Sequence, residues 1–344
     1  MSKLIAGFIL AATMILSPLS TSAIQADDAP AAAVEVTNTH VFKSVLPENT
    51  RAGVSVYLQD ISVTIVTNRG EGSGVVKSKK DEHGNVVNFV WTAAHVVDSL
   101  RNVRNVIDPK TGTSRQIVEF ADAYVVKDIK QDGRSVGQLK LAAEVVRYSD
   151  ADTGHDLALL RIRKNGFIKS SAVFYTGEIP AIGTDLFHVG SLLGQMGSNS
   201  MTTGIVSQQG RLIGGGNKKV FDQTTCPGFP GSSGGGVFTT DGRYMGMLVR
   251  GAGETFNLIV PVRRMRNWVK EANIEWAMTD DAMPIDKVMD RLPIEDVGKS
   301  WSAAKHQGDR AGAHDPAPAT INGVKIKDLF GRYPVKPTEK AKEE

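Results

Sequence analysis

Short apolar runs separated by turn residues dominate the chain from Val45 to about Ala277. Apolar runs of this length, bounded by Gly and charged turns, are typical of barrels or sandwiches rather than of βαβ units. The pattern therefore predicts an all-β fold class. Strands are expected at residues 53–58, 61–66, 74–76, 86–92, 121–126, 139–146, 157–162, 185–189, 202–207, 237–239 and 244–249.

One helical pattern stands out near the end of the β-rich region. After Pro261, apolar residues recur at helical spacing, namely Val262, Met265, Trp268, Val269 and Ala272. Beyond Ala277 the chain becomes polar, with a short helix expected at 283–292 and a linker at 306–320. We therefore expect a lead-in at 27–44, a folded domain at 45–277, and a polar, partly disordered tail at 278–344.

The N-terminus has the features of a secretory signal peptide. Lys3 precedes an apolar run, Leu4 to Leu19, and small residues follow, with cleavage expected after Ala23 or Ala26. An uncleaved anchor is the alternative, but the run is shorter than the ~20 residues that a spanning helix prefers. We therefore assign residues 1–26 to a signal peptide and expect no stable membrane association after cleavage.

The cysteine content and the net charge limit the cellular compartment and the classes of binding partner that fit this chain. Cys226 is the only cysteine, so no intrachain disulfide can form, which suits an exported bacterial protein, periplasmic or extracellular. The net charge of +3 is too small to indicate nucleic-acid binding. The densest basic cluster, Arg263, Arg264 and Arg266, is interpreted as a solvated helix end. The histidines show no metal-ligand spacing, so we predict neither a metal nor a cofactor.

Three motifs carry the candidate chemistry. His95 closes an apolar run, Asp156 opens another, and Ser233 lies among glycines. A serine hydroxyl needs an adjacent base to act as a nucleophile, and imidazole suits because its ordinary pKa is about 6.5. A carboxylate on the other imidazole nitrogen fixes the tautomer and stabilises the imidazolium. The order His, Asp, Ser therefore predicts a nucleophilic triad.

The glycines around Ser233 predict the second half of such a site. Gly231 and Ser233 are two residues apart, so their backbone N–H groups can converge on the oxyanion that develops on a substrate carbonyl. Gly231 can adopt backbone angles closed to other residues, and Gly234 and Gly235 leave room above the nucleophile. We expect Gly231 and Ser233 to form the oxyanion hole.

Five ordered blocks resemble the trypsin-like serine peptidases, in particular the bacterial HtrA/Deg and glutamyl-endopeptidase-like branch. The resemblance implies two perpendicular six-stranded antiparallel β-barrels of the chymotrypsin type with a C-terminal helix, a triad in the cleft, and polypeptide substrates. It covers roughly 45–277, and no PDZ-like pattern follows. Ser232 replaces the Asp of trypsin zymogens and Gly236 replaces a usual Pro. The blocks are residues 72–76 (GSGVV), 91–97 (WTAAHVV), 155–160 (HDLALL), 204–207 (GIVS) and 230–235 (PGSSGG).

Two other classes fit parts of this pattern. Residues 231–235 also match G-x-S-x-G, the nucleophile elbow of α/β-hydrolase esterases, but a strand-like sequence rather than a helix follows Ser233. That class also places Asp and His after Ser, leaving only His306 and His314. A catalytically silent or latent binding protein on the same scaffold is the second alternative, and the presence of all three triad residue types disfavours it.

The substrate pocket is expected between residues 225–230 and 246–251. The first stretch holds no acidic residue, which disfavours a Lys or Arg preference, and a small or medium apolar side chain is predicted, with Arg250 favouring an acidic one as the alternative. Residues 210–216 are expected to form a mobile loop near the cleft. The pocket residues that we assign are Thr225, Pro227, Phe229, Leu248, Val249 and Arg250.

Overall fold

The computed structural model describes residues 37–213, 219–251, 255–296, 320–321 and 324–325. The predicted signal peptide, residues 27–36 of the lead-in and the linker at 306–319 lie outside the described residues. Within the part of the chain that is described, no helix combines the length and apolar character needed to cross a membrane.

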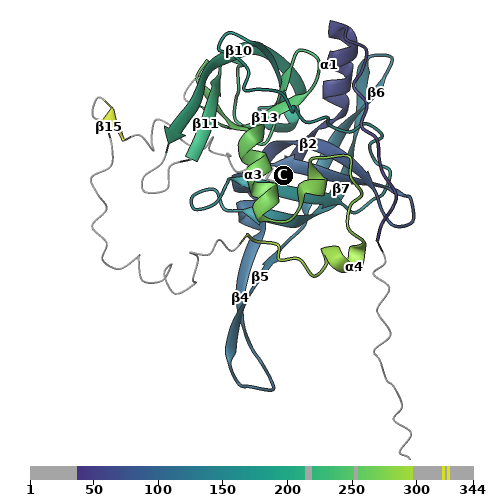
Figure 1. Cartoon of the computed structure of the whole chain (residues 1–344), viewed down its shortest axis with the longest axis vertical. Helices are drawn as coiled ribbons and strands as arrows, with labels where there is room; N and C mark the ends of the chain where they lie inside the picture. The colour runs from purple at the N-terminus through teal and green to yellow at the C-terminus, as the bar shows by residue number, and fades with distance from the viewer. Residues whose placement is uncertain (1–36, 214–218, 252–254, 297–319, 322–323, 326–344) are drawn as a thin grey trace, which may run out of the picture. The chain divides into compact units, whose positions relative to one another are not determined.

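Two closed six-stranded antiparallel barrels make up the fold (Figure 1). This confirms the predicted all-β class and the pair of barrels. The strands of the first, in spatial order, are β1 (Ser62–Val66), β2 (Glu71–Lys80), β3 (Val86–Thr92), β8 (Leu157–Ile162), β7 (Arg134–Ser149) and β6 (Ala123–Gln131). Those of the second are β10 (Gly197–Ile213), β11 (Lys219–Thr224), β14 (Asn257–Pro261), β13 (Tyr244–Gly251), β12 (Gly236–Thr239) and β9 (Asp185–Leu192).

The remaining elements are short, apart from one hairpin and two helices. Strands β4 (Arg101–Ile107) and β5 (Ser114–Phe120), which the sequence pattern did not predict, pair with each other alone and form the long blue hairpin of Figure 1. Helix α3 spans Val262–Glu271, as its apolar spacing predicted. The others are α1 (Arg51–Asp60), α2 (Ala94–Val97), η1 (Asp98–Leu100), η2 (Gly194–Met196), η3 (Glu275–Ala277), α4 (Asp286–Met289), β15 (Thr320–Ile321) and β16 (Val324–Lys325).

The strand expected at 53–58 is wrong, because this segment is part of helix α1. The Thr50 hydroxyl accepts a hydrogen bond from the Gly53 N–H and caps the first turn. Val54 and Leu58, four residues apart, are buried on one face, whereas Val56 is 68% exposed. A short apolar alternation is compatible with either period, and here the N-cap and the buried face select the helix.

An aromatic cluster joins the two barrels and helix α3. Trp91 of β3 makes edge-on contacts with Phe174 and with Trp268 of α3, at centroid distances of 5.8 and 5.6 Å. All three rings lie in one continuous buried cluster with residues of both barrels. Because Trp91 lies four residues before His95, this packing fixes the end of β3 from which His95 projects.

The packed chain continues beyond the boundary expected at Ala277. Met278, Met283 and Met289 are buried in the main core, and the carboxylate of Asp280 pairs with the buried Lys77 ammonium at 2.7 Å. Residue Ser44 of the expected lead-in also hydrogen-bonds to Asp280. Residues 37–44 and 278–296 are therefore part of the fold, which the polar composition of both segments concealed.

Candidate active site

The register of the first barrel brings His95 and Asp156 together. Thr92, at the end of β3, pairs with Ala158 near the start of β8, so the residues just beyond these strands lie at the same edge. The His95 Nδ1 atom is 3.0 and 3.1 Å from the two carboxylate oxygens of Asp156, and the His95 backbone N–H donates to the same carboxylate at 3.2 Å. This contact orients the imidazole and leaves its Nε2 edge toward the cleft.

The Asp156 carboxylate is buried and remains ionised because its surroundings compensate for the loss of water. Asp156 is 1% exposed, and burial alone would raise the pKa of its carboxyl group. The charge and hydrogen bonds of His95, together with the positive charge of Arg250, outweigh burial and hold the pKa well below the ordinary value. Asp156 also has φ = 57°, a left-handed conformation that Asp tolerates better than most residues.

Cations from the second barrel and from α3 tether the loop that carries Asp156. Arg264 of α3 donates from Nη2 to the carbonyl of His155 at 2.6 Å, and Lys219 donates to the carbonyls of Ala151 and Asp152 at 3.0 and 2.8 Å. Arg264 is only 6% exposed, and its guanidinium stacks on the Phe221 ring at 4.7 Å. The interpretation of the arginine cluster as a solvated helix end is therefore wrong for Arg264.

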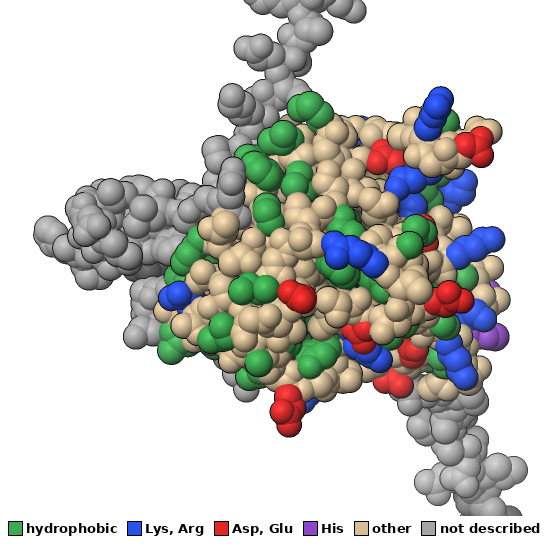
Figure 2. Space-filling view, turned by 90° about the horizontal axis from the view of Figure 1, so that it is seen from above, with side chains coloured by type: hydrophobic (Ala, Val, Ile, Leu, Met, Phe, Trp, Pro, Cys, Tyr) green, Lys and Arg blue, Asp and Glu red, His purple; other side chains and the backbone are tan. Residues whose placement is uncertain are grey.

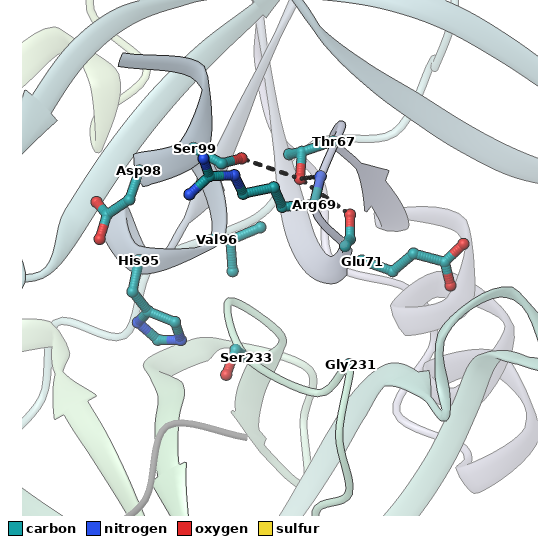
Figure 3. Close-up of a pocket in the computed structure, with 10 residues that line it drawn as sticks. Thr67, Arg69, Glu71, His95, Val96, Asp98, Ser99, Gly231 and Ser233 are labelled. Atoms are coloured by element: carbon teal, nitrogen blue, oxygen red, sulfur yellow. Dashed lines mark hydrogen bonds between the residues drawn. The ribbon is translucent and has the colours of Figure 1, made fainter. Parts of the chain in front are cut away.

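Ser233 lies across the cleft from His95, on the loop between β11 and β12. Both residues line a cavity of about 330 Å³, and Figure 3 shows their side chains next to each other at its lower end. Ser233 is 5% exposed. No described residue forms a hydrogen bond with His95 Nε2, so Ser233 Oγ and the imidazole are neighbours without a closed hydrogen bond.

The backbone N–H groups of Gly231 and Ser233 form no hydrogen bond to the described part of the chain. Gly231 has φ = 94°, and a Cβ at this position would lie 2.3 Å from the Ser191 carbonyl oxygen. Both the angle and the space therefore require glycine. The two N–H groups are available on the loop at residues 225–235, which we call the nucleophile loop, as the predicted oxyanion hole requires.

The two departures from the trypsin pattern have local structural reasons. The Ser232 side chain is fully buried, and its hydroxyl accepts a hydrogen bond from the Phe229 N–H at 3.1 Å, which stabilises the turn before Ser233. A Cβ at Gly236 would lie 2.2 Å from the ring of Phe238. Gly236 therefore makes room for a buried aromatic side chain on the same strand.

The residues assigned to the substrate pocket differ in exposure, and none of them lines the cavity that holds His95 and Ser233. Leu248 and Val249 are buried, while Thr225, Pro227, Phe229 and Arg250 are half-buried. The guanidinium of Arg250 lies 5.8 Å from the Phe221 ring centroid. Of the loop expected at 210–216, residues 210–213 belong to the end of β10, and residues 214–218 lie outside the described residues.

Sequence reasoning missed Asn257, a buried amide that contacts the segment expected to form one wall of the substrate pocket. Its Nδ2 donates to the Cys226 carbonyl at 2.9 Å, and its Oδ1 is 3.3 Å from the position of a Cβ at Gly228. The one sequence signal was a polar residue at the head of the apolar run 257–260. Cys226 itself is buried, and burial raises the pKa of its thiol to about 11, so it is not a reactive thiolate at neutral pH.

The sequence profile of the trypsin-like peptidase domain family matches residues 72–247, about half of the chain, including all three triad candidates. The chain belongs to the trypsin-like peptidase domain family.

Solved structures similar to this peptidase domain include HtrA/Deg-type serine proteases. The serine endoprotease from Yersinia pestis is 21% identical with a TM-score of 0.46, over 65% of this chain and 66% of that one. Deg5 is 23% identical with a TM-score of 0.45, over 63% and 90%. AlgW, an HtrA-type protease solved with a tripeptide, is 19% identical with a TM-score of 0.46, over 66% and 64%.

The alignment thus spans less than two thirds of the AlgW chain and 66% of the Yersinia pestis chain. A comparison with curated protein sequences gives no significant match.

Other titratable clusters in the peptidase domain do not resemble a metal site. In the described ranges, no group of three or more His, Cys, Asp or Glu side chains is placed to hold a metal ion. His155 contacts Glu271 of α3 at 3.1 Å rather than His95. On the face shown in Figure 2, basic and acidic side chains are mixed rather than gathered into one basic patch.

The buried His188 lies directly behind the nucleophile loop of the peptidase domain. Its Nδ1 is 2.9 Å from the Gly236 carbonyl oxygen, Nε2 has no partner among the described residues, and a Cβ at Gly235 would lie 2.7 Å from Cε1. Burial lowers the pKa of His188 to about 4, only partly offset by the Gly236 hydrogen bond. The fold therefore holds this imidazole neutral.

We predict that His188 makes the domain acid-sensitive. In the unfolded chain His188 binds a proton with the ordinary pKa of ~6.5, whereas in the folded protein it does so only near pH 4. Stability is therefore fully present above pH ~6.5 and falls by about 3 kcal/mol as the pH decreases through this window. Urea unfolding at pH 7.5, 6, 5 and 4.5 should show a smaller loss of unfolding free energy for His188→Gln, whose amide can still donate to Gly236.

Exposed His83→Gln is the control, and identical pH profiles for wild type and His188→Gln would contradict the prediction.

Proposed function

We propose that this chain is a serine endopeptidase that hydrolyses peptide bonds through Ser233, His95 and Asp156 and an acyl-enzyme intermediate. The observation that carries the proposal is the 3.0 Å contact between His95 Nδ1 and the buried Asp156 carboxylate, with the free Nε2 edge beside Ser233. Family membership supports a hydrolase of this type. Neither a metal nor a cofactor is needed for the steps below.

In the proposed reaction, His95 Nε2 takes the proton of the Ser233 hydroxyl while Oγ attacks the scissile carbonyl carbon. The oxyanion is stabilised by the N–H groups of Gly231 and Ser233. The imidazolium, held by Asp156, then gives its proton to the leaving amine, and the C–N bond breaks. A water molecule activated by His95 attacks the acyl-enzyme, and Ser233 regains its proton as the acid product leaves.

The open Ser233–His95 contact favours one alternative, a silent or latent binding protein on the same scaffold. His95 Nε2 has no hydrogen-bond partner among the described residues, so the last contact of the triad has to close for catalysis. Catalytic hydrogen bonds often tighten only when substrate is bound, and the proposal requires this here. Reactivity toward an active-site probe separates the two functions.

We predict that a fluorophosphonate probe labels the folded wild-type protein and that Ser233→Ala abolishes labelling. The probe reacts with a serine only when an adjacent base activates it. Asp156→Asn should slow labelling on the order of 10⁴-fold, because the imidazole then adopts the wrong tautomer. In-gel fluorescence and mass spectrometry of the labelled peptide provide the measurement.

Ser62→Ala is a matched control for this experiment, because Ser62 is an equally buried hydroxyl that bonds to the Leu58 carbonyl away from the cleft. It should label like wild type. A folded wild type that remains unlabelled would favour the silent or latent alternative, and persistent labelling of Ser233→Ala would reject Ser233 as the nucleophile.

For the substrate side chain on the acyl side of the cut, we propose a small or medium apolar residue. Leu248, Val249 and Phe229 supply apolar walls, and residues 225–230 contain no carboxylate that could pair with Lys or Arg. A peptide-library digest should therefore show Ala, Val, Leu or similar residues at this position. Cleavage dominated by Lys, Arg, Asp or Glu would overturn this part of the proposal; an Asp or Glu preference would instead favour Arg250 as the selecting group.

We also propose that the protein is exported and acts on polypeptides outside the cytoplasm, without nucleic-acid partners. The support is the sequence of residues 1–26 and the single cysteine. When the full chain is expressed in a bacterium, N-terminal sequencing of the protein from the periplasm or medium should give a start after Ala23 or Ala26. Retention of Met1 on cell-associated protein would contradict export with cleavage.

A further inference from the structure

The two N–H groups of the candidate oxyanion hole are aimed by hydrogen bonds to the carbonyls of their own peptide groups. Pro230 C=O shares its peptide with Gly231 N–H and accepts from the Leu193 N–H at 2.7 Å. Ser232 C=O shares its peptide with Ser233 N–H and accepts from the Gly235 N–H at 2.9 Å. Because a trans peptide is planar, fixing each carbonyl fixes the N–H on the opposite side.

The peptide group between Gly231 and Ser232 lies between these two peptide groups, and Ser73 of β2, in the first barrel, holds it in place. The Ser73 hydroxyl donates to the Gly231 carbonyl at 2.7 Å and accepts from the Ser191 N–H of β9, also at 2.7 Å. The Ser73 N–H donates to the Ser233 carbonyl at 2.7 Å. One residue, 1% exposed, thus bonds to the nucleophile loop twice and to a strand of the second barrel once.

This arrangement matters because glycine allows the loop to rotate. Gly231, at φ = 94°, has no side chain to restrict the peptide that follows it. Without the Ser73 hydroxyl, the Gly231 carbonyl and the Ser191 N–H both lose a hydrogen-bond partner. Because unpaired buried polar groups are costly, the observed loop conformation becomes less stable relative to others. In the observed arrangement the Gly231 carbonyl accepts from Ser73, and no acceptor among the described residues competes with an oxyanion at the N–H groups of Gly231 and Ser233.

We propose that Ser73 is a positioning residue for the oxyanion hole, which its hydroxyl holds in the orientation that receives the substrate oxyanion. The inference rests on the proposed peptidase function and concerns the backbone of the nucleophile loop rather than the triad. Ser73 does not touch substrate. It acts through Gly231, and its loss should affect the transition state more than substrate binding.

Ser78→Ala is a closely matched control for Ser73→Ala. Ser78 lies on the same strand, is equally buried, and its hydroxyl also donates one hydrogen bond and accepts one, to the Ser170 carbonyl and from the Asn88 Nδ2. Its partners lie away from the cleft. Both substitutions therefore remove the same atom and the same number of hydrogen bonds from β2, but only one touches the nucleophile loop.

The test uses the full chain and p-nitrophenyl acetate, whose acyl group needs no side-chain pocket. For Ser73→Ala we expect kcat to fall on the order of 10- to 100-fold, with KM changed by less than about twofold. The second-order rate of fluorophosphonate labelling should fall by a similar factor, because the phosphonyl oxygen uses the same N–H groups. Ser73→Thr, which keeps the hydroxyl, should recover most of the rate.

Several outcomes would decide against the inference. Equal kcat and labelling rates for Ser73→Ala and Ser78→Ala would overturn it, as would an effect confined to KM. If Ser73→Ala lowers only the folded fraction, rates normalised to folded protein by urea unfolding would equal those of wild type, which also overturns it. A folded wild type that neither labels nor hydrolyses the ester would contradict the proposed function itself, a result distinct from these.

Discussion

The buried carboxylate of Asp156 is the interaction on which the rest of the site depends. An ionised carboxylate removed from water costs several kcal/mol unless its surroundings replace the lost hydration. Here the replacement comes from His95 on the same barrel, from the charges of Arg250 and Lys219 on the second barrel, and from the charge of Arg264 on α3. The packing of the two barrels against each other is therefore part of the electrostatics of the site.

The two barrels contribute different parts of the proposed chemistry, and each holds the other in place. The first supplies the acid–base pair, and the second supplies the nucleophile loop with its two N–H groups. Arg264 and Lys219 reach from the second barrel and α3 to the loop that carries Asp156, while Ser73 reaches from the first barrel to the loop that carries Ser233. Each candidate catalytic loop is thus tethered by a polar side chain of the opposite half of the molecule.

The candidate site residues could be picked out in the sequence because their signals are local. His95, Asp156 and Ser233 each lie where an apolar run ends or begins, or among glycines that a nucleophile loop requires. The tethers could not be predicted, because they depend on long-range contacts. Arg264 looked like a surface residue of an amphipathic helix, and only the position of the His155 carbonyl explains its burial.

The parts of the fold that the sequence pattern missed have similar causes. Residues 278–296 are polar on average, and their three buried methionines follow no regular period, so only the barrel surface and the partner Lys77 reveal that this segment packs. In helix α1 the alternation of Val54, Val56 and Leu58 suited a strand equally well, and the buried face decided the outcome. Paired strands β4 and β5 carry mostly exposed side chains and left no strong apolar pattern.

We propose that the two barrels assemble one nucleophilic site in which Ser233 carries the acyl group. Acid quenching of a reaction with p-nitrophenyl acetate, followed by peptide mass spectrometry, tests it most directly, because the ester bond of an acyl-enzyme survives at low pH. We predict an acetyl group on Ser233 that is absent after His95→Ala. An acetyl group on Ser232 or Cys226 instead, or on Ser233 at an equal rate without His95, would contradict it.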